Sequence, residues 1–178
     1  FMLLEHMEGK KVLLCTGETF CRGNKEKQEP PYHRAPFGGD AANITIVENA
    51  GNEKVYYEFH QDGSQRKCLV IPDGAFRNPM TVEQIQNQIV RMPLTGVVMD
   101  GSTVFNFAQK EVPILVDSLT KMAETTKEDI DWFLFHQPNK FMLQKLAERI
   151  GVPFEKMPMD IVEKFGNSNS ATIPTAIT

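Results

Sequence analysis

Three apolar runs in the chain predict strands of a buried sheet. They are residues 11–16 (KVLLCT), 41–47 (AANITIV) and 132–135 (WFLF), and none of them gives a regular polar face to solvent. Strands of this composition are typical of sheets covered on both faces. We therefore expect all three to be strands largely removed from water, with shorter strands at residues 55–60 and 68–71.

Glycine and polar residues set the ends of these runs. Gly38 and Gly39 directly precede the second run, which predicts a close approach of two backbone segments at that point. Residues 22–36 are polar, charged and rich in proline, so they predict a surface loop. Residues 62–64 (DGS) predict a tight turn.

The longest predicted helix comes from apolar residues at intervals of three or four. The residues that share this face are Val104, Ala108, Val112, Leu115, Leu119 and Met122. We expect them to form one buried stripe, with Pro113 inside the helix. Shorter helices are predicted at residues 140–150, closed by Gly151, and at 159–165, stopped by Gly166. Strands and helices in alternation predict a layered α/β fold.

Charge and composition limit the classes of function. The 178 residues include 19 Lys and Arg against 23 Asp and Glu, a net charge of −4. A negative chain is a poor ligand for nucleic acid, so no nucleic-acid partner is expected. No apolar run is long enough to cross a bilayer, so no membrane partner is expected either.

The cysteines indicate the redox compartment. Cys15, Cys21 and Cys68 are odd in number and include no CxxC pair. This pattern indicates neither a disulfide framework nor a zinc site, and a reducing cytoplasm is the simplest location. We expect no metal in this chain.

Two polar residues are candidates for chemistry. His136 follows the apolar run 132–135, where α/β sheets place ligands and catalytic groups, although such a histidine is as often a structural residue. Asn167 lies in a turn of small residues, GNSNS, that would allow a substrate to approach closely. A helix-capping loop is an equally good interpretation of this turn.

The same two regions resemble a known family. Residues 132–139 (WFLFHQPN) and 165–174 (FGNSNSATIP) resemble, in order and separation, the HQAN-like and GNTSAAS-like motifs of β-ketoacyl-acyl-carrier-protein synthase III. Residues 39–42 (GDAA) and 99–105 (MDGSTVF) resemble two further segments of that family. The resemblance covers nearly the whole chain and corresponds to the C-terminal half of such a synthase.

The resemblance implies a thiolase-like layered α/β fold, incomplete in this chain. Residues 1–50 would be the end of the N-terminal half and residues 51–178 most of the C-terminal half. It implies an acyltransferase that condenses an acyl thioester with malonyl-acyl carrier protein, with loss of CO₂, to a 3-oxoacyl product. Acyl carrier protein, acyl-coenzyme A and a second copy in a homodimer are the implied partners. No cofactor is implied beyond the coenzyme A or phosphopantetheine of the substrates.

Site residues follow from the same resemblance. His136 and Asn167 match the catalytic His and Asn, which donate hydrogen bonds to the malonyl thioester oxygen. The positions assigned to substrate binding are Asn139, Gly101, Ser102 and Phe105, and those assigned to carrier-protein docking are Lys140, Lys145 and Arg149. On the residues alone, the three basic side chains are equally typical of a solvated helix face.

Some features depart from the family pattern. The nucleophilic cysteine of the family would precede Phe1, so Cys15, Cys21 and Cys68 are not assigned that role. Ser102 replaces a common Asn, and Phe141 stands where many members carry an Arg, which leaves the acyl donor open.

Two alternatives remain. The chain could belong to a non-catalytic homologue that serves as the dimer partner of an active synthase. It could also belong to a related thiolase-superfamily synthase with another acceptor, although HQPN rather than HPGG argues against the chalcone-synthase branch.

Overall fold

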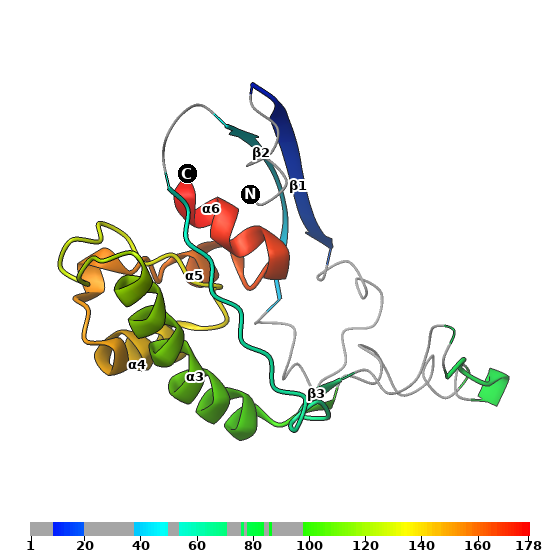
Figure 1. Cartoon of the computed structure of the whole chain (residues 1–178). Helices are drawn as coiled ribbons and strands as arrows, with labels where there is room; N and C mark the ends of the chain where they lie inside the picture. Colours follow the sequence, from blue (N-terminus) through cyan, green and yellow to red (C-terminus); the bar gives the residue numbers. More distant parts are fainter. Residues whose placement is uncertain are drawn as a thin grey trace.

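The computed structural model describes residues 9–19, 38–49, 54–70, 76, 78–83, 86 and 98–178. Its principal elements are β1 (Lys11–Thr19), β2 (Asp40–Glu48), β3 (Leu69–Val70), β4 (Val98–Met99), α3 (Gly101–Met122), α4 (Lys140–Ile150), η3 (Phe154–Lys156), α5 (Ile161–Phe165), η4 (Asn169–Ala171) and α6 (Thr172–Ile177). All but β4, η3 and η4 are labelled in Figure 1. The predicted loop at 22–36 lies outside the described residues. The described elements include both strands and helices, which agrees with the predicted α/β class.

The larger sheet is an antiparallel pair of long strands. β1 and β2 pair along their full length, from Lys11 opposite Glu48 to Thr19 opposite Asp40. The strands predicted at 11–16 and 41–47 are therefore confirmed. Their predicted removal from water is wrong, because only one face packs against η4 and α6, while the other face remains exposed.

The short sheet pairs β3 with β4, Leu69 opposite Met99 and Val70 opposite Val98. It confirms the predicted strand at 68–71 within the described residues. The strand predicted at 55–60 is wrong, since this segment belongs to no strand. The turn at 62–64 is confirmed, where the Ser64 amide donates to Asp62 Oδ1 over 2.8 Å.

The hydrophobic core lies around α4. Four of its side chains, Leu143, Leu146, Ala147 and Ile150, are buried. They pack with Phe133, Val152, Met157 and Met159. Gly151 ends the helix in the left-handed conformation (φ 80°), which confirms the predicted helix and its glycine stop.

The long helix α3 packs along α4 (Figure 1). Its extent and the internal Pro113 agree with the predicted period. No residue of α3 is fully buried, so the predicted buried stripe is wrong in degree. Val112 and its neighbour Val116 contact the core, the other residues of the stripe up to Leu119 are half-buried, and Met122 is exposed.

The strand predicted at 132–135 is also corrected. This segment is extended but belongs to no sheet. The Phe133 amide donates to the Lys156 carbonyl over 2.8 Å, and Phe133 is buried while Trp132 is exposed. An apolar run becomes a strand only where a neighbouring strand completes the ladder, and the described residues supply a short helical turn there instead.

The short helix after the core positions the second motif. α5 confirms the helix predicted at 159–165, although it begins at Ile161. α6 packs against β2, so the two parts into which the resemblance divides the chain are in contact. The division at residue 50 itself stays a prediction. Within the described residues, no helix is long and apolar enough to cross a membrane.

Candidate functional site

The extended segment before α4 holds His136. Its Nδ1 lies 2.9 Å from the hydroxyl of Thr172, the buried first residue of α6. The next residue, Gln137, is also buried, and its side-chain amide donates to the carbonyls of Phe135 and Pro158 over 3.2 and 2.9 Å. The contact with Thr172 and the buried hydrogen bonds of Gln137 therefore fix the position of His136.

The charge state of His136 follows from its surroundings. Partial burial lowers the pKa of His136 below its usual value, and the Asn169 carbonyl opposes this effect in part. A lowered pKa keeps the ring neutral near pH 7. A neutral imidazole has a single N–H to donate, so the nitrogen that carries the proton determines what the ring can do.

The backbone around Asn167 is held by a distant part of the chain. Gly38 and Asn167 form a parallel β-bridge, and the Gly39 amide donates to the Asn167 carbonyl over 2.9 Å. A methyl group on Gly39 would overlap the carbonyl oxygen of Phe165, and one on Gly166 would lie 2.5 Å from the Gly38 oxygen. The close backbone approach predicted at the two glycines is confirmed.

The side chain of Asn167 is oriented by its own turn. Its Oδ1 accepts from the Asn169 amide over 2.9 Å, which leaves the two N–H groups of Nδ2 as its donors. The carbonyl of Asn169 accepts from the Thr172 hydroxyl over 2.8 Å. Asn169 has a positive φ of 44°, a conformation that Asn tolerates better than most residues.

One residue thus connects the two candidates. The peptide groups of Asn169 contact Asn167 on one side and the Thr172–His136 pair on the other. The arrangement can present two hydrogen-bond donors, one from an imidazole and one from a carboxamide. That both reach a common oxygen, at roughly 2.7–3.2 Å, stays a prediction.

The site also depends on three residues that no sequence motif assigned a role, namely Thr172, Asn169 and Asn43. Asn43 Nδ2 donates to the Ala171 carbonyl and the Thr175 hydroxyl, each over 3.1 Å, and so ties β2 to α6. A sequence signal for Thr172 exists, because a hydroxyl residue closely followed by a proline, here Pro174, is typical of the start of a helix. Asn43 carries no such signal, since its partners lie about 130 residues away.

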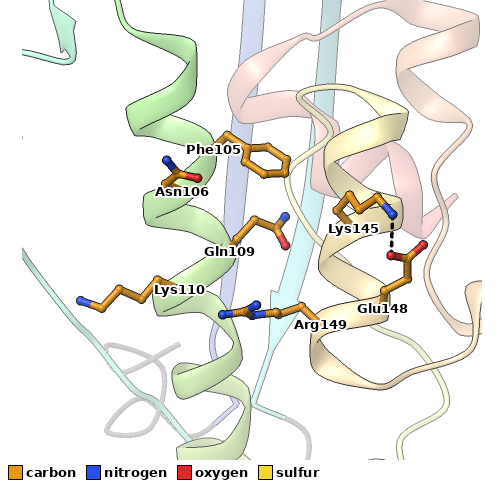
Figure 2. Close-up of a pocket in the computed structure, with 7 residues that line it drawn as sticks. All are labelled: Phe105, Asn106, Gln109, Lys110, Lys145, Glu148 and Arg149. Atoms are coloured by element: carbon orange, nitrogen blue, oxygen red, sulfur yellow. Dashed lines mark hydrogen bonds and ion pairs between the residues drawn. The ribbon is translucent and has the colours of Figure 1, made fainter.

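A groove of about 450 Å³ lies between α3 and α4 (Figure 2). Its lining residues are Phe105, Asn106, Gln109, Lys110, Lys145, Glu148 and Arg149. Phe105 stacks on Phe141 with ring centroids 5.9 Å apart. The groove therefore brings together one residue predicted to bind substrate, Phe105, and two predicted to bind the carrier protein, Lys145 and Arg149.

The other predicted site residues have local partners. Asn139 caps α4, since its Oδ1 accepts from the Met142 amide over 2.8 Å. Ser102, beside Gly101 in the first turn of α3, donates to Asp100 over 2.7 Å. Lys140 lies 3.3 Å from Glu163 across to α5. Their roles toward a ligand stay predictions.

The hydroxyl groups at the start of α3 also stabilise a charge. Ser102 and Thr103 donate hydrogen bonds to Asp100, and these bonds lower its pKa to about 2. The N-terminal end of α3 therefore carries a fixed negative charge at neutral pH.

The cysteines lie apart from this constellation. Cys15 is exposed and faces the same side of the sheet as its partner Ile44, opposite to the side from which Asn43 contacts α6. Cys68 is half-buried next to β3, and Cys21 lies outside the described residues. Among the residues the structure describes, no three His, Cys, Asp or Glu side chains gather as a metal site would require.

The part of the chain that holds His136 and Asn167 is similar to known proteins. The family model for the C-terminal part of 3-oxoacyl-[acyl-carrier-protein] synthase III matches residues 120–178, which include both His136 and Asn167. The β-ketoacyl-[acyl-carrier-protein] synthase III of Synechocystis is 30% identical over 141 residues, which is 79% of this chain and 42% of that protein.

Solved structures agree with the sequence relatives and confirm the thiolase-like α/β fold class predicted from the sequence. A 3-oxoacyl-(acyl-carrier-protein) synthase III crystal structure superposes with a TM-score of 0.76 at 30% identity, covering 93% of this chain and 50% of that one. The 3-oxoacyl-(acyl-carrier protein) synthase from Burkholderia xenovorans LB400 gives 0.71 at 31% identity, covering 95% and 47%. The chain spans about half the length of the relatives it matches.

Proposed function

Because the chain belongs to the 3-oxoacyl-[acyl-carrier-protein] synthase III family, we propose that its complete protein is a condensing acyltransferase. It joins an acyl thioester to malonyl-acyl carrier protein with loss of CO₂ and releases a 3-oxoacyl product. Within that enzyme, this chain supplies the two hydrogen-bond donors for the malonyl group.

The chemistry asks for such donors at one oxygen. When the bond between the malonyl α-carbon and its carboxylate breaks, CO₂ leaves and the electron pair spreads onto the thioester oxygen. His136 and Asn167 donate to that oxygen and stabilise its negative charge. The α-carbon then attacks the carbonyl carbon of the acyl group held as a thioester, the carbon–sulfur bond of that thioester breaks, and the sulfur leaves as a thiolate. Removing one such donor typically slows a reaction about 100- to 1000-fold.

The observation that carries this proposal is the position of Asn169. Its amide donates to Oδ1 of Asn167, which leaves the Nδ2 donors of Asn167 for another acceptor. Its carbonyl contacts the Thr172 hydroxyl that lies at His136, so both donors are linked to a single turn. Preorganised donors of this kind stabilise developing charge without reorganising during the reaction.

We place the approach of the carrier protein along the groove of Figure 2. Lys110, Lys145 and Arg149 line it in a chain whose net charge is negative. Lys110 pairs with Glu111 and Lys145 with Glu148, each over 2.7 Å, which leaves the positive charge of Arg149 in excess. A local excess of positive charge favours an acidic partner. Phe105, stacked on Phe141, gives the end of the groove near the start of α4 an apolar wall for the arm that carries the acyl group.

A homodimer and a cytoplasmic location complete the proposal. The dimer rests on the resemblance alone, and sedimentation velocity of the complete protein tests it. The location is supported by the free thiols of Cys15 and Cys68.

Substitution of the two donors tests the function. In the complete protein, His136→Ala and Asn167→Ala should each reduce malonyl decarboxylation and condensation by about 100-fold or more, with acylation of the nucleophilic cysteine comparatively intact. His60→Ala is the matched control, since His60 is exposed and paired with Glu58.

Two results would contradict the proposal. Normal condensation by both variants would return His136 and Asn167 to structural roles. A wild-type protein that neither condenses nor decarboxylates, but raises the activity of a co-expressed synthase, would establish the non-catalytic alternative.

A further inference from the structure

The hydroxyl of Thr172 has three hydrogen-bonding neighbours but only one proton to donate. Its oxygen lies 2.9 Å from His136 Nδ1 and 2.8 Å from the Asn169 carbonyl, and it accepts from the backbone N–H of Gln137 over 3.4 Å. Thr172 is fully buried, so water does not replace any of these partners. A hydroxyl has one proton, which can go either to the Asn169 carbonyl or to Nδ1.

The two arrangements give His136 opposite properties. If the proton points to the Asn169 carbonyl, Thr172 can only accept from the ring, and a neutral His136 carries its proton on Nδ1. Nε2 is then a bare acceptor. If Thr172 donates to Nδ1, the ring proton is on Nε2, and His136 can donate to a substrate oxygen.

We propose that Thr172 is a positioning residue that sets the tautomer of His136 by donating its hydroxyl proton to Nδ1. The ring proton then resides on Nε2, the nitrogen that is left for the substrate. This inference rests on the proposed function, because the condensing reaction asks His136 to act as a hydrogen-bond donor.

The surroundings tolerate this arrangement. Asn169 is exposed, so its carbonyl can take a water molecule as donor when the Thr172 proton turns to the ring. The backbone N–H of Gln137 occupies one lone pair of the Thr172 hydroxyl oxygen. The hydroxyl proton therefore points toward His136 Nδ1 or the Asn169 carbonyl. Asn43 holds the start of α6 through Ala171 and Thr175, which keeps Thr172 at the ring.

Removing the hydroxyl should invert the tautomer. In Thr172→Val the hydroxyl beside Nδ1 is gone, and the Asn169 carbonyl that this hydroxyl contacted can only accept a proton. The proton would move to Nδ1, and Nε2 could no longer donate. Thr172→Ser keeps a hydroxyl and should restore the wild-type tautomer.

Nitrogen-15 NMR of labelled histidine in the complete protein tests this directly, above the pKa of His136. The wild type and Thr172→Ser should show the proton on Nε2, and Thr172→Val should show it on Nδ1. Malonyl decarboxylation by Thr172→Val should fall in kcat about 100-fold with little change in KM. Thr120→Val in α3 is the matched control, because its half-buried hydroxyl also bonds back within its helix, to the Val116 carbonyl over 3.0 Å, without contacting the ring.

The outcomes separate this proposal from the proposed function. A wild-type ring protonated on Nδ1, or a Thr172→Val ring still protonated on Nε2, would overturn the role of Thr172. A tautomer that inverts as expected with no loss of decarboxylation would support Thr172 and refute His136 as the donor. If Thr172→Val fails to fold, the wild-type and Thr172→Ser spectra still decide the tautomer.

Discussion

The turn around Asn167 and the groove between α3 and α4 are held in place by different contacts. At the turn, Gly38 and Gly39 touch the backbone of residues 165–167, with no room for a side chain. In the groove, the exposed side chains of Lys145 and Glu148, three residues apart on α4, pair with each other over 2.7 Å. The turn is therefore held by backbone contacts between segments far apart in sequence, whereas the charged side chains of the groove pair with near neighbours.

This difference separates the two tasks of the proposed enzyme. Stabilising charge on one oxygen requires donors fixed to a fraction of an ångström, which backbone contacts provide. Attracting a carrier protein requires only charge of the right sign, which flexible surface side chains provide. We therefore expect substitutions to damage the turn through geometry and the groove through charge.

Gly39→Ala should have the largest effect on the turn. Its methyl group would overlap the Phe165 carbonyl and push apart the two segments that hold Asn167. Overpacking against backbone should cost about 3 kcal/mol of the free energy of unfolding, together with condensing activity. Chemical denaturation measures the loss.

Gly63→Ala is the control for that experiment, because nothing lies within 4 Å of the added methyl group. Equal stability of the two variants would mean that the close approach at Gly39 does not hold the turn.

The sequence anticipated these regions unequally. The period of α3, the stop at Gly151 and the close approach at Gly39 are local signals, and each is confirmed. The burial of β1 and the strand at 132–135 could not be predicted, because both depend on which segments cover or pair with them. Likewise, the contact of Thr172 with His136 requires α6 to be placed in space.

Asn43→Ala tests the long-range support of the turn more mildly. The variant loses donors to the Ala171 carbonyl and the Thr175 hydroxyl, which should cost about 1–2 kcal/mol of unfolding free energy. The loosened α6 should also lower decarboxylation several-fold. Thermal unfolding and kcat measure the two effects.

Asn106→Ala in the groove is the comparison, since this side chain is exposed. An Asn43→Ala protein as stable as Asn106→Ala would show that the link from β2 to α6 contributes nothing.

Charge reversal tests carrier-protein docking along α4, at Arg149 in the groove and at Lys140, the first residue of the helix. In the complete protein, Lys140→Glu with Arg149→Glu should slow association with acyl carrier protein about tenfold at low salt and flatten its dependence on salt. Folding should be little affected, because both side chains are exposed. Stopped-flow association at several ionic strengths measures the effect.

Lys164→Glu on α5 is the matched control, since it reverses an exposed charge outside the groove. If the double variant and this control respond equally to salt, Lys140 and Arg149 belong to a solvated helix face.

The smallest expected effect is the dependence of stability on pH through His136. Its pKa in the folded protein is lowered, chiefly by partial burial, so the unfolded chain binds the proton more readily than the folded one. Stability is then fully present above the unfolded value of about 6.5 and falls as the pH drops from there toward the lowered pKa. His136→Gln should remove this part of the pH dependence, which unfolding by urea between pH 5 and 8 measures. If stability instead rose in the wild type as the ring became protonated, His136 would be stabilised as a cation, and the neutral donor that the turn is proposed to hold would be wrong.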